Sequence, residues 1–127
     1  MADWNLKKVV VVDGDGEFND DLARRLRERG YEPMVLRRGA QALKTVKDNK
    51  PGAVVLDLTL PDRDGRQVLK EIKDDWDAKK VPVIVATGYP SRLDAAGRSQ
   101  VEAVLVKPVD WDELLSRIQE ACAKKRD

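Results

Sequence analysis

The chain has 127 residues, and its 24 basic and 23 acidic residues leave a formal net charge of +1. This length suits one domain with its own core, so we expect residues 1–127 to form a single domain. The lack of histidine excludes His-based acid–base catalysis and His metal ligation, the single cysteine excludes an internal disulfide, and the interspersed charges argue against direct nucleic-acid binding.

The first expected element is a strand at the apolar run Val9–Val12, which is too short for a signal peptide or a membrane span. We therefore expect a cytoplasmic protein without membrane contact. The next segment has apolar residues at every fourth position, namely Phe18, Leu22 and Leu26. This spacing predicts a helix, and Gly30 suits its end. The more polar segment Glu32–Leu36 contains Pro33, which favours an edge strand.

A second helix comes next and is expected to end before Pro51. It is followed by a buried strand at Ala53–Leu56. The apolar residues of that helix are Ala42, Leu43 and Val46. Asp64 can cap a third helix. Its apolar face is expected to carry Val68, Leu69, Ile72 and Trp76.

Two further strands are expected at Val83–Ala86 and Ala103–Val106. The segment Ser91–Gln100 between them has few apolar residues, and we expect a short helix there with Ser91 as its cap. Asp110 and Glu113 form a capping-box pattern before a last helix. The apolar face of that helix is Leu114, Ile118, Ala121 and Cys122. The alternation of strands and helices predicts an α/β fold, a three-layer sandwich around a five-stranded parallel sheet.

Four of the strands end in a polar residue that suits phosphoryl chemistry. These residues are Asp13, Asp57, Thr87 and Lys107. Because the carboxyl ends of parallel strands share one edge, we expect these side chains to converge there. Paired carboxylates favour Mg²⁺, an ammonium and a hydroxyl bind phosphate, and a carboxylate can act as the nucleophile. The set therefore predicts phosphoryl transfer to an aspartate.

The segment Val-Val-Leu-Asp57-Leu-Thr-Leu-Pro61-Asp-Arg-Asp-Gly65 resembles the phosphoacceptor segment of bacterial response regulator receiver domains. Val-Pro82-Val-Ile-Val-Ala-Thr87 and Val-Lys107-Pro108 resemble two further motifs of that family. The resemblance covers essentially the whole chain. It implies the flavodoxin-like strand order 2-1-3-4-5, phosphorylation by a sensor histidine kinase or a phosphotransfer protein, and a downstream protein partner.

The resemblance also implies residue roles. Asp57 would accept the phosphoryl group, Thr87 would hydrogen-bond to it, and Lys107 would pair with its charge. Mg²⁺ would be held by Asp13, Asp57 and the backbone carbonyl of Thr59. A cis bond would precede Pro108. The expected readout is the face of the fourth helix, fifth strand and fifth helix, through which such domains also form homodimers.

The chain departs from the family pattern at two places. Gly14 stands where the family has a metal-binding acid, and Asp15 is the candidate substitute because glycines flank it and permit unusual backbone angles. Val104 replaces the usual aromatic residue of the fifth strand, and Tyr89 is a candidate stand-in that would also partly cover the site.

Two alternatives stay open at this point. The departures at Gly14 and Val104 would suit a degenerate receiver that acts through protein contacts without phosphorylation. The motif Asp13-Gly-Asp15-Gly resembles that of haloacid dehalogenase-type phosphatases, in which Asp13 would be the nucleophile. The second alternative leaves Asp57 unexplained, and no acidic pair recognisable as that family's fourth motif follows the last expected strand. We therefore favour a signalling domain over an enzyme.

Overall fold

Strands and helices alternate along the chain in this computed structural model, which describes residues 3–124 and 126. The strands are β1 (Asn5–Val12), β2 (Glu32–Leu36), β3 (Pro51–Leu56), β4 (Val83–Thr87) and β5 (Ala103–Val106). The α-helices are α1 (Gly16–Glu28), α2 (Ala42–Asn49), α3 (Gly65–Asp74), α4 (Ala95–Arg98) and α5 (Trp111–Ala123). Short 3-10 turns are η1 (Gly39–Gln41), η2 (Ala78–Lys80) and η3 (Pro90–Arg92).

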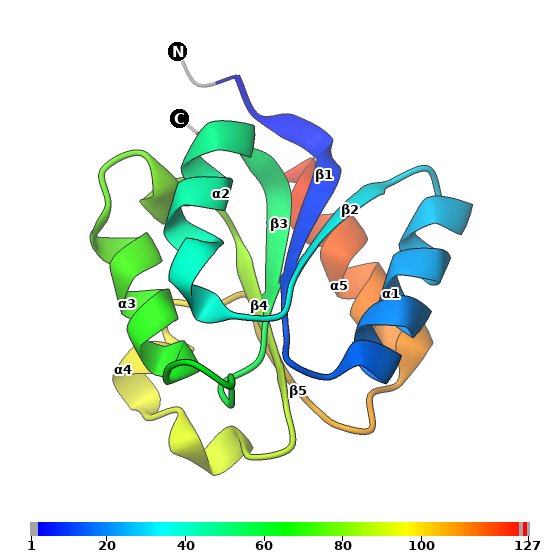
Figure 1. The fold of residues 1–127 in the computed structure, drawn as a ribbon. Coiled ribbons are helices and arrows are strands. Elements are labelled where there is room, and N and C mark those ends of the chain that lie inside the picture. Colours follow the sequence, from blue (N-terminus) through cyan, green and yellow to red (C-terminus); the bar gives the residue numbers. More distant parts are fainter. Residues whose placement is uncertain (1–2, 125, 127) are drawn as a thin grey trace.

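The five strands form one parallel sheet in the order β2-β1-β3-β4-β5, which confirms the predicted fold class and strand order. Helices α1 and α5 cover one face, and α2, α3 and α4 lie on the other (Figure 1). In the register of the central strands, Val12 of β1 lies beside Leu36 of β2 and Leu56 of β3. The carboxyl ends of these strands therefore meet at one edge.

The core has two halves because the sheet is covered on both sides. Val9 and Val11 of β1 pack with α1 and α5, whereas Val10 and Val12 pack with α2 and α3. Side chains alternate between the two faces of a strand, so both sets must be apolar. This explains why the buried strands are continuous valine-rich runs rather than alternating patterns.

Two details of the expected helices are wrong. Helix α3 ends at Asp74, and Trp76 lies beyond it with 79% of its surface exposed and the Lys79 ammonium over its ring. Trp76 thus does not belong to the buried face of the helix. The cap of α4 is Asp94, which accepts a hydrogen bond from the amide of Gly97. Ser91 cannot take this place because it lies within η3.

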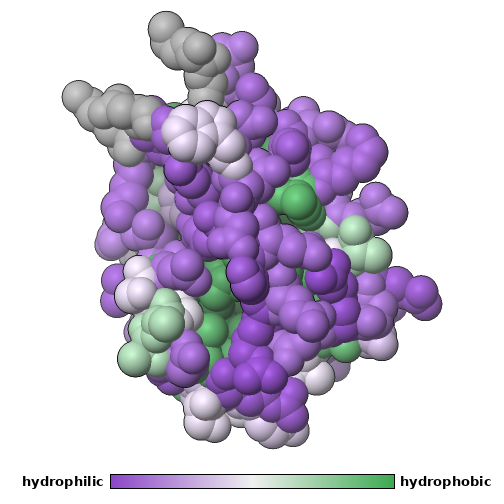
Figure 2. Space-filling view, turned by 90° about the vertical axis from the view of Figure 1, so that its left-hand side faces the viewer, coloured by the Kyte–Doolittle hydropathy of each residue, from purple (hydrophilic) through white to green (hydrophobic). Residues whose placement is uncertain are grey.

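The surface is mainly hydrophilic, as the 37% of charged residues leads one to expect. Figure 2, which views the molecule from the side of α3, shows only small hydrophobic areas between charged side chains. Within residues 3–124 and 126, no helix is long and apolar enough to cross a membrane.

Candidate functional site

Two buried carboxylates lie side by side where the central strands end. Asp13 directly follows β1 and is 1% exposed, and Asp57 directly follows β3 and is 8% exposed. The backbone continues the sheet here, because the amide of Asp57 donates to the carbonyl of Val12 at 3.0 Å. The parallel pairing of β1 with β3 thus brings together two acids that are 44 positions apart in the sequence.

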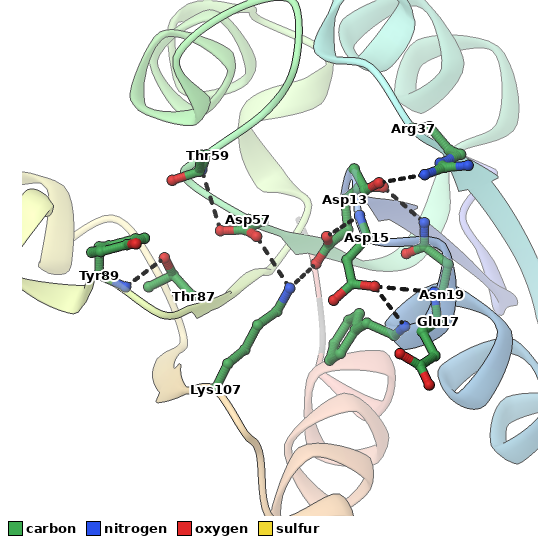
Figure 3. Close-up of polar contacts among 12 residues, drawn as sticks. Asp13, Asp15, Glu17, Asn19, Arg37, Asp57, Thr59, Thr87, Tyr89 and Lys107 are labelled. Carbon is green, nitrogen blue, oxygen red and sulfur yellow. Dashed lines mark hydrogen bonds and ion pairs between the residues drawn. The ribbon is translucent and has the colours of Figure 1, made fainter.

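Lys107, which follows β5, joins these two acids (Figure 3). Its Nζ donates to Oδ2 of Asp13 at 2.7 Å and to Oδ2 of Asp57 at 3.1 Å. The same ammonium lies 4.2 Å from the ring centre of Phe18, a contact that contributes cation–π attraction. The peptide bond between Lys107 and Pro108 is cis, which confirms the expected isomer.

Burial and pairing act in opposite directions on these groups. Burial is the largest effect on Asp13, and it raises the pKa of this carboxyl although hydrogen bonds from Lys107 and Asp15 lower it. Burial alone would lower the pKa of Lys107, but the hydrogen bonds and charges of Asp13 and Asp57 outweigh it and raise that pKa. Lys107 therefore stays charged at neutral pH, and its ammonium group is the cation between the two carboxylates.

The loop after β1 is held by its neighbours rather than by glycine conformations. Oδ1 of Asp15 accepts the amides of Glu17 and Phe18 and so caps α1. Among the described residues, Gly30 is the only glycine with positive φ, so neither Gly14 nor Gly16 uses the left-handed conformation that glycine permits. The carbonyl of Gly14 instead accepts a hydrogen bond from Nη2 of Arg37 at 2.7 Å.

The oxygen atoms at this edge of the sheet could supply only a few of the ligands that Mg²⁺ needs. Within residues 3–124 and 126, no three acidic, histidine or cysteine side chains are grouped to hold a metal ion. Two carboxylates, those of Asp13 and Asp57, are together, and Oδ1 of Asp15 is occupied as a helix cap. Mg²⁺ is often bound through one or two carboxylates, waters and phosphate oxygens. The residues present therefore fit a weakly held Mg²⁺ that shares its shell with phosphate.

The two hydroxyl residues lie on the other side of Asp57 from Asp13 (Figure 3). The amide of Thr59 donates to Oδ1 of Asp57 at 3.2 Å. Thr87 ends β4 and is fully buried, and its hydroxyl accepts the amide of Tyr89 at 3.1 Å. Tyr89 itself is largely exposed. The structure thus places all four predicted strand-end residues at the same edge, with Thr87 bonded to its own loop.

Several supporting residues were missed by the sequence analysis. The buried amide of Asn19 donates to the carbonyl of Asp13 at 2.7 Å, and Arg92 donates to the hydroxyl of Thr59 at 3.0 Å. Arg37 follows β2 directly, so the rule that strand ends converge would have found it. Asn19 and Arg92 carry no such signal, because one lies inside α1 and the other in the 3-10 turn η3.

An α/β signalling domain of the receiver type is the class that this fold and edge cluster define. The solved structure of the response regulator TrrA from Thermotoga maritima, in complex with Mg²⁺-BeF, superposes with a TM-score of 0.80. The two sequences are 27% identical, and the match covers 91% of this chain and 98% of TrrA.

Curated relatives agree with this class. The polar-differentiation response regulator DivK of Brucella anthropi is 33% identical over 116 residues, which are 89% of this chain and 94% of DivK. The response regulator MprA of Mycobacterium sp. strain KMS is 31% identical over 112 residues, 88% of this chain but 49% of MprA. The chain therefore spans about half the length of MprA.

Residues 9–119 match the family described as the response regulator receiver domain, and the chain belongs to this family. Receiver domains are parts of two-component signalling systems and are not classical enzymes. They interact with histidine kinases and with downstream partners.

Proposed function

We propose that residues 1–127 form one receiver domain whose Asp57 accepts a phosphoryl group from the phosphohistidine of a sensor kinase or phosphotransfer protein. A carboxylate oxygen of Asp57 attacks phosphorus, the P–N bond breaks, and the imidazole leaves with the electron pair. The observation that carries this proposal is the Lys107 ammonium, held at 2.7 Å from Asp13 and 3.1 Å from Asp57. It lies where the charge of the phosphoryl oxygens must be neutralised.

The neighbouring groups have matching roles in this proposal. Asp13, Asp57 and the carbonyl of Thr59 would hold Mg²⁺, and the bound ion would neutralise charge on the phosphoryl oxygens. Asp15 would join them only through the oxygen that does not cap α1. The Thr87 hydroxyl, which accepts the amide of Tyr89, would donate its own proton in a hydrogen bond to a phosphoryl oxygen.

The output of the domain would be a change in protein contacts. Phosphorylation would shift a two-state equilibrium, because the phosphoryl group would draw Thr87 toward it, together with the loop after β4 that is bonded to the Thr87 hydroxyl. The readout face is formed by α4, β5 and α5, and Val106 of β5 is an exposed apolar residue on it. A downstream partner or a second copy of the chain would bind there. The phosphoryl transfer from the sensor kinase to Asp57 would take place in the cytoplasm, because such a kinase draws its phosphoryl group from ATP.

A degenerate receiver is the second candidate, and one observation favours it. Lys107 already satisfies both carboxylates, and the described residues contain no third acid grouped with them. Such a domain would bind partners without phosphorylation.

Intact-mass spectrometry with a small phosphodonor and Mg²⁺ separates the two candidates. We expect a phosphoryl mass increment on the wild type and none on Asp57→Asn. An increment that persists in Asp57→Asn but not in Asp13→Asn would instead support the phosphatase alternative. No increment on either protein would favour the degenerate receiver.

The variant Gly14→Asp then tests the missing acid. A Cβ at this position would lie 3.0 Å from Cδ of Pro61, so the loop has to shift slightly to accept it. Labelling of Gly14→Asp under conditions in which the wild type is not labelled would assign the defect to metal binding.

A further inference from the structure

Three arginines hold the loop between β4 and α4 against the site. Nη1 of Arg92 donates to the hydroxyl of Thr59 at 3.0 Å. The carbonyl of Arg92 accepts Nη1 of Arg66 from α3 at 3.3 Å. Arg98 of α4 donates to the carbonyls of Pro90 and Leu93, at 2.8 Å and 3.1 Å. Arg66 and Arg98 thus contact this loop through its backbone carbonyls, whereas Arg92 reaches across to Thr59, two positions after the phosphoacceptor.

One residue separates the Arg92 guanidinium from Asp57. Thr59 receives the hydrogen bond of Arg92 on its hydroxyl and donates its amide to Oδ1 of Asp57 at 3.2 Å. The Arg92 side chain is exposed, so it is free to turn from the Thr59 hydroxyl toward a phosphoryl group on Asp57. The guanidinium is kept over the ring of Tyr89, 4.7 Å from its centre, and this stacking leaves its edge free for hydrogen bonds.

The guanidinium of Arg92 forms no ion pair with a carboxylate of the described residues in the resting structure. Its side-chain hydrogen bond goes to a neutral hydroxyl, and the nearby acid Asp64 is engaged by Arg66 through several hydrogen bonds. Within the described part of the chain, no carboxylate lies within ion-pair distance of Arg92. A guanidinium binds phosphate oxygens by charge-assisted and often bidentate hydrogen bonds, which are stronger than a bond to a hydroxyl.

We propose that Arg92 is a phosphoryl-binding residue: when Asp57 is phosphorylated, its guanidinium leaves the Thr59 hydroxyl and binds a phosphoryl oxygen. The inference rests on the proposed phosphorylation of Asp57. It gives the site a second protein cation beside Lys107, on the opposite side of the phosphoryl group. This cation compensates in part for the acid that Gly14 replaces, because less of the phosphoryl charge is left for a metal ion to neutralise.

The experiment measures the initial rate of labelling by a small phosphodonor and the affinity for beryllium fluoride, a phosphoryl mimic. We expect Arg92→Gln to lower both by roughly tenfold, the scale of one charged hydrogen bond. Arg92→Lys should recover part of the loss because it keeps the charge. Arg98→Gln is the matched control, since it frees the same loop without removing a cation from the site, and it should label at the wild-type rate.

Thr59→Val tests whether Arg92 acts as a ligand or merely ties the loop down. It removes the resting partner of the guanidinium, so a phosphoryl ligand should bind beryllium fluoride as tightly as in the wild type or more tightly. If Arg92 were only a tie, Arg92→Gln and Thr59→Val would change labelling in the same direction and to the same extent. That result, or wild-type labelling by Arg92→Gln, would overturn the inference.

The two proposals fail in different ways. A wild type that is never labelled, or is labelled equally in Asp57→Asn, rejects the proposed function and with it the role of Arg92. A labelled wild type with unchanged Arg92→Gln rejects the role of Arg92 alone. Urea unfolding midpoints of each variant show whether a loss of labelling reflects a loss of folding.

Discussion

Asp13 is a carboxyl group that the fold buries almost completely, and its single close cation is Lys107 among the described residues. Burial raises the pKa of Asp13 above its ordinary value of 3.8. Between 3.8 and the raised value, the folded state binds more protons at this group than the unfolded state does. The free energy of unfolding therefore falls as the pH rises through this window. The ionised carboxylate of Asp13 thus lowers the free energy of unfolding at neutral pH.

We predict that Asp13→Asn abolishes this pH dependence. Urea unfolding at a series of pH values from below 3.8 to neutrality should show the wild type losing stability relative to Asp13→Asn as the pH rises. The exposed Asp62 is a control of opposite sign, because hydrogen bonds from the amides of Gly39 and Ala40 help to lower its pKa. Asp62→Asn should lose stability relative to the wild type at neutral pH. A constant difference between Asp13→Asn and the wild type at every pH would contradict the argument.

At the scale of elements, the start of α3 packs on the backbone that presents Asp57. The amide of Gly65 donates to the carbonyl of Leu58 at 2.8 Å. A Cβ at Gly65 would lie 2.2 Å from the carbonyl oxygen of Asp57 and 2.6 Å from Cα of Leu58. Neither of these backbone atoms can move away without displacing the end of β3. The glycine is therefore required by close packing between a helix and a strand end.

Gly65→Ala should lower the free energy of unfolding by about 3 kcal/mol, because overpacking against backbone forces the helix and the strand end apart. Urea unfolding measures this loss, and labelling of Asp57 should fall with it. Gly88→Ala is the matched control, since its added Cβ meets no atom within 4 Å and its φ is not left-handed. Equal midpoints for the two variants would show that the chain relaxes at this contact.

At the scale of the whole molecule, α5 packs against the sheet, and its single thiol, that of Cys122, lies in the contact. Cys122 is buried, and a Cβ on Gly52 of β3 would lie 2.6 Å from its sulfur. Burial raises the pKa of Cys122 to about 11, so the thiol is protonated as well as covered at neutral pH. Its chemical modification therefore requires that α5 separates from the sheet.

We predict that a thiol reagent labels Cys122 in the native protein on the order of a thousandfold more slowly than in the urea-unfolded chain, because the opening draws on most of the global stability. The labelling rate, followed by mass spectrometry in buffer and in urea at the same pH, measures this protection. Rapid labelling without urea would mean that α5 opens locally, and it would place a mobile element on the proposed readout face.

The sequence predicted the bounds of two strands and missed the start of another. Glu32–Leu36 and Ala103–Val106 are confirmed as expected, whereas β1 begins at Asn5 rather than at Val9. The residues before Val9 are largely exposed and join the sheet through the backbone pairing of Asn5 with Pro51. Hydrophobic patterns report which side chains are buried, and they carry no signal for backbone pairing in water-exposed segments.

The sequence by itself determined the fold class and the set of polar residues that end the strands, and its resemblance to receiver domains implied the strand order. It could do so because buried parallel strands must be apolar on both faces and must end at one common edge. Only the tertiary structure decided how the side chains use their bonds. Lys107 bridges Asp13 and Asp57, Asp15 caps α1, and Arg92 reaches Thr59. Such contacts depend on side-chain positions between segments far apart in the chain, and local sequence patterns do not encode them.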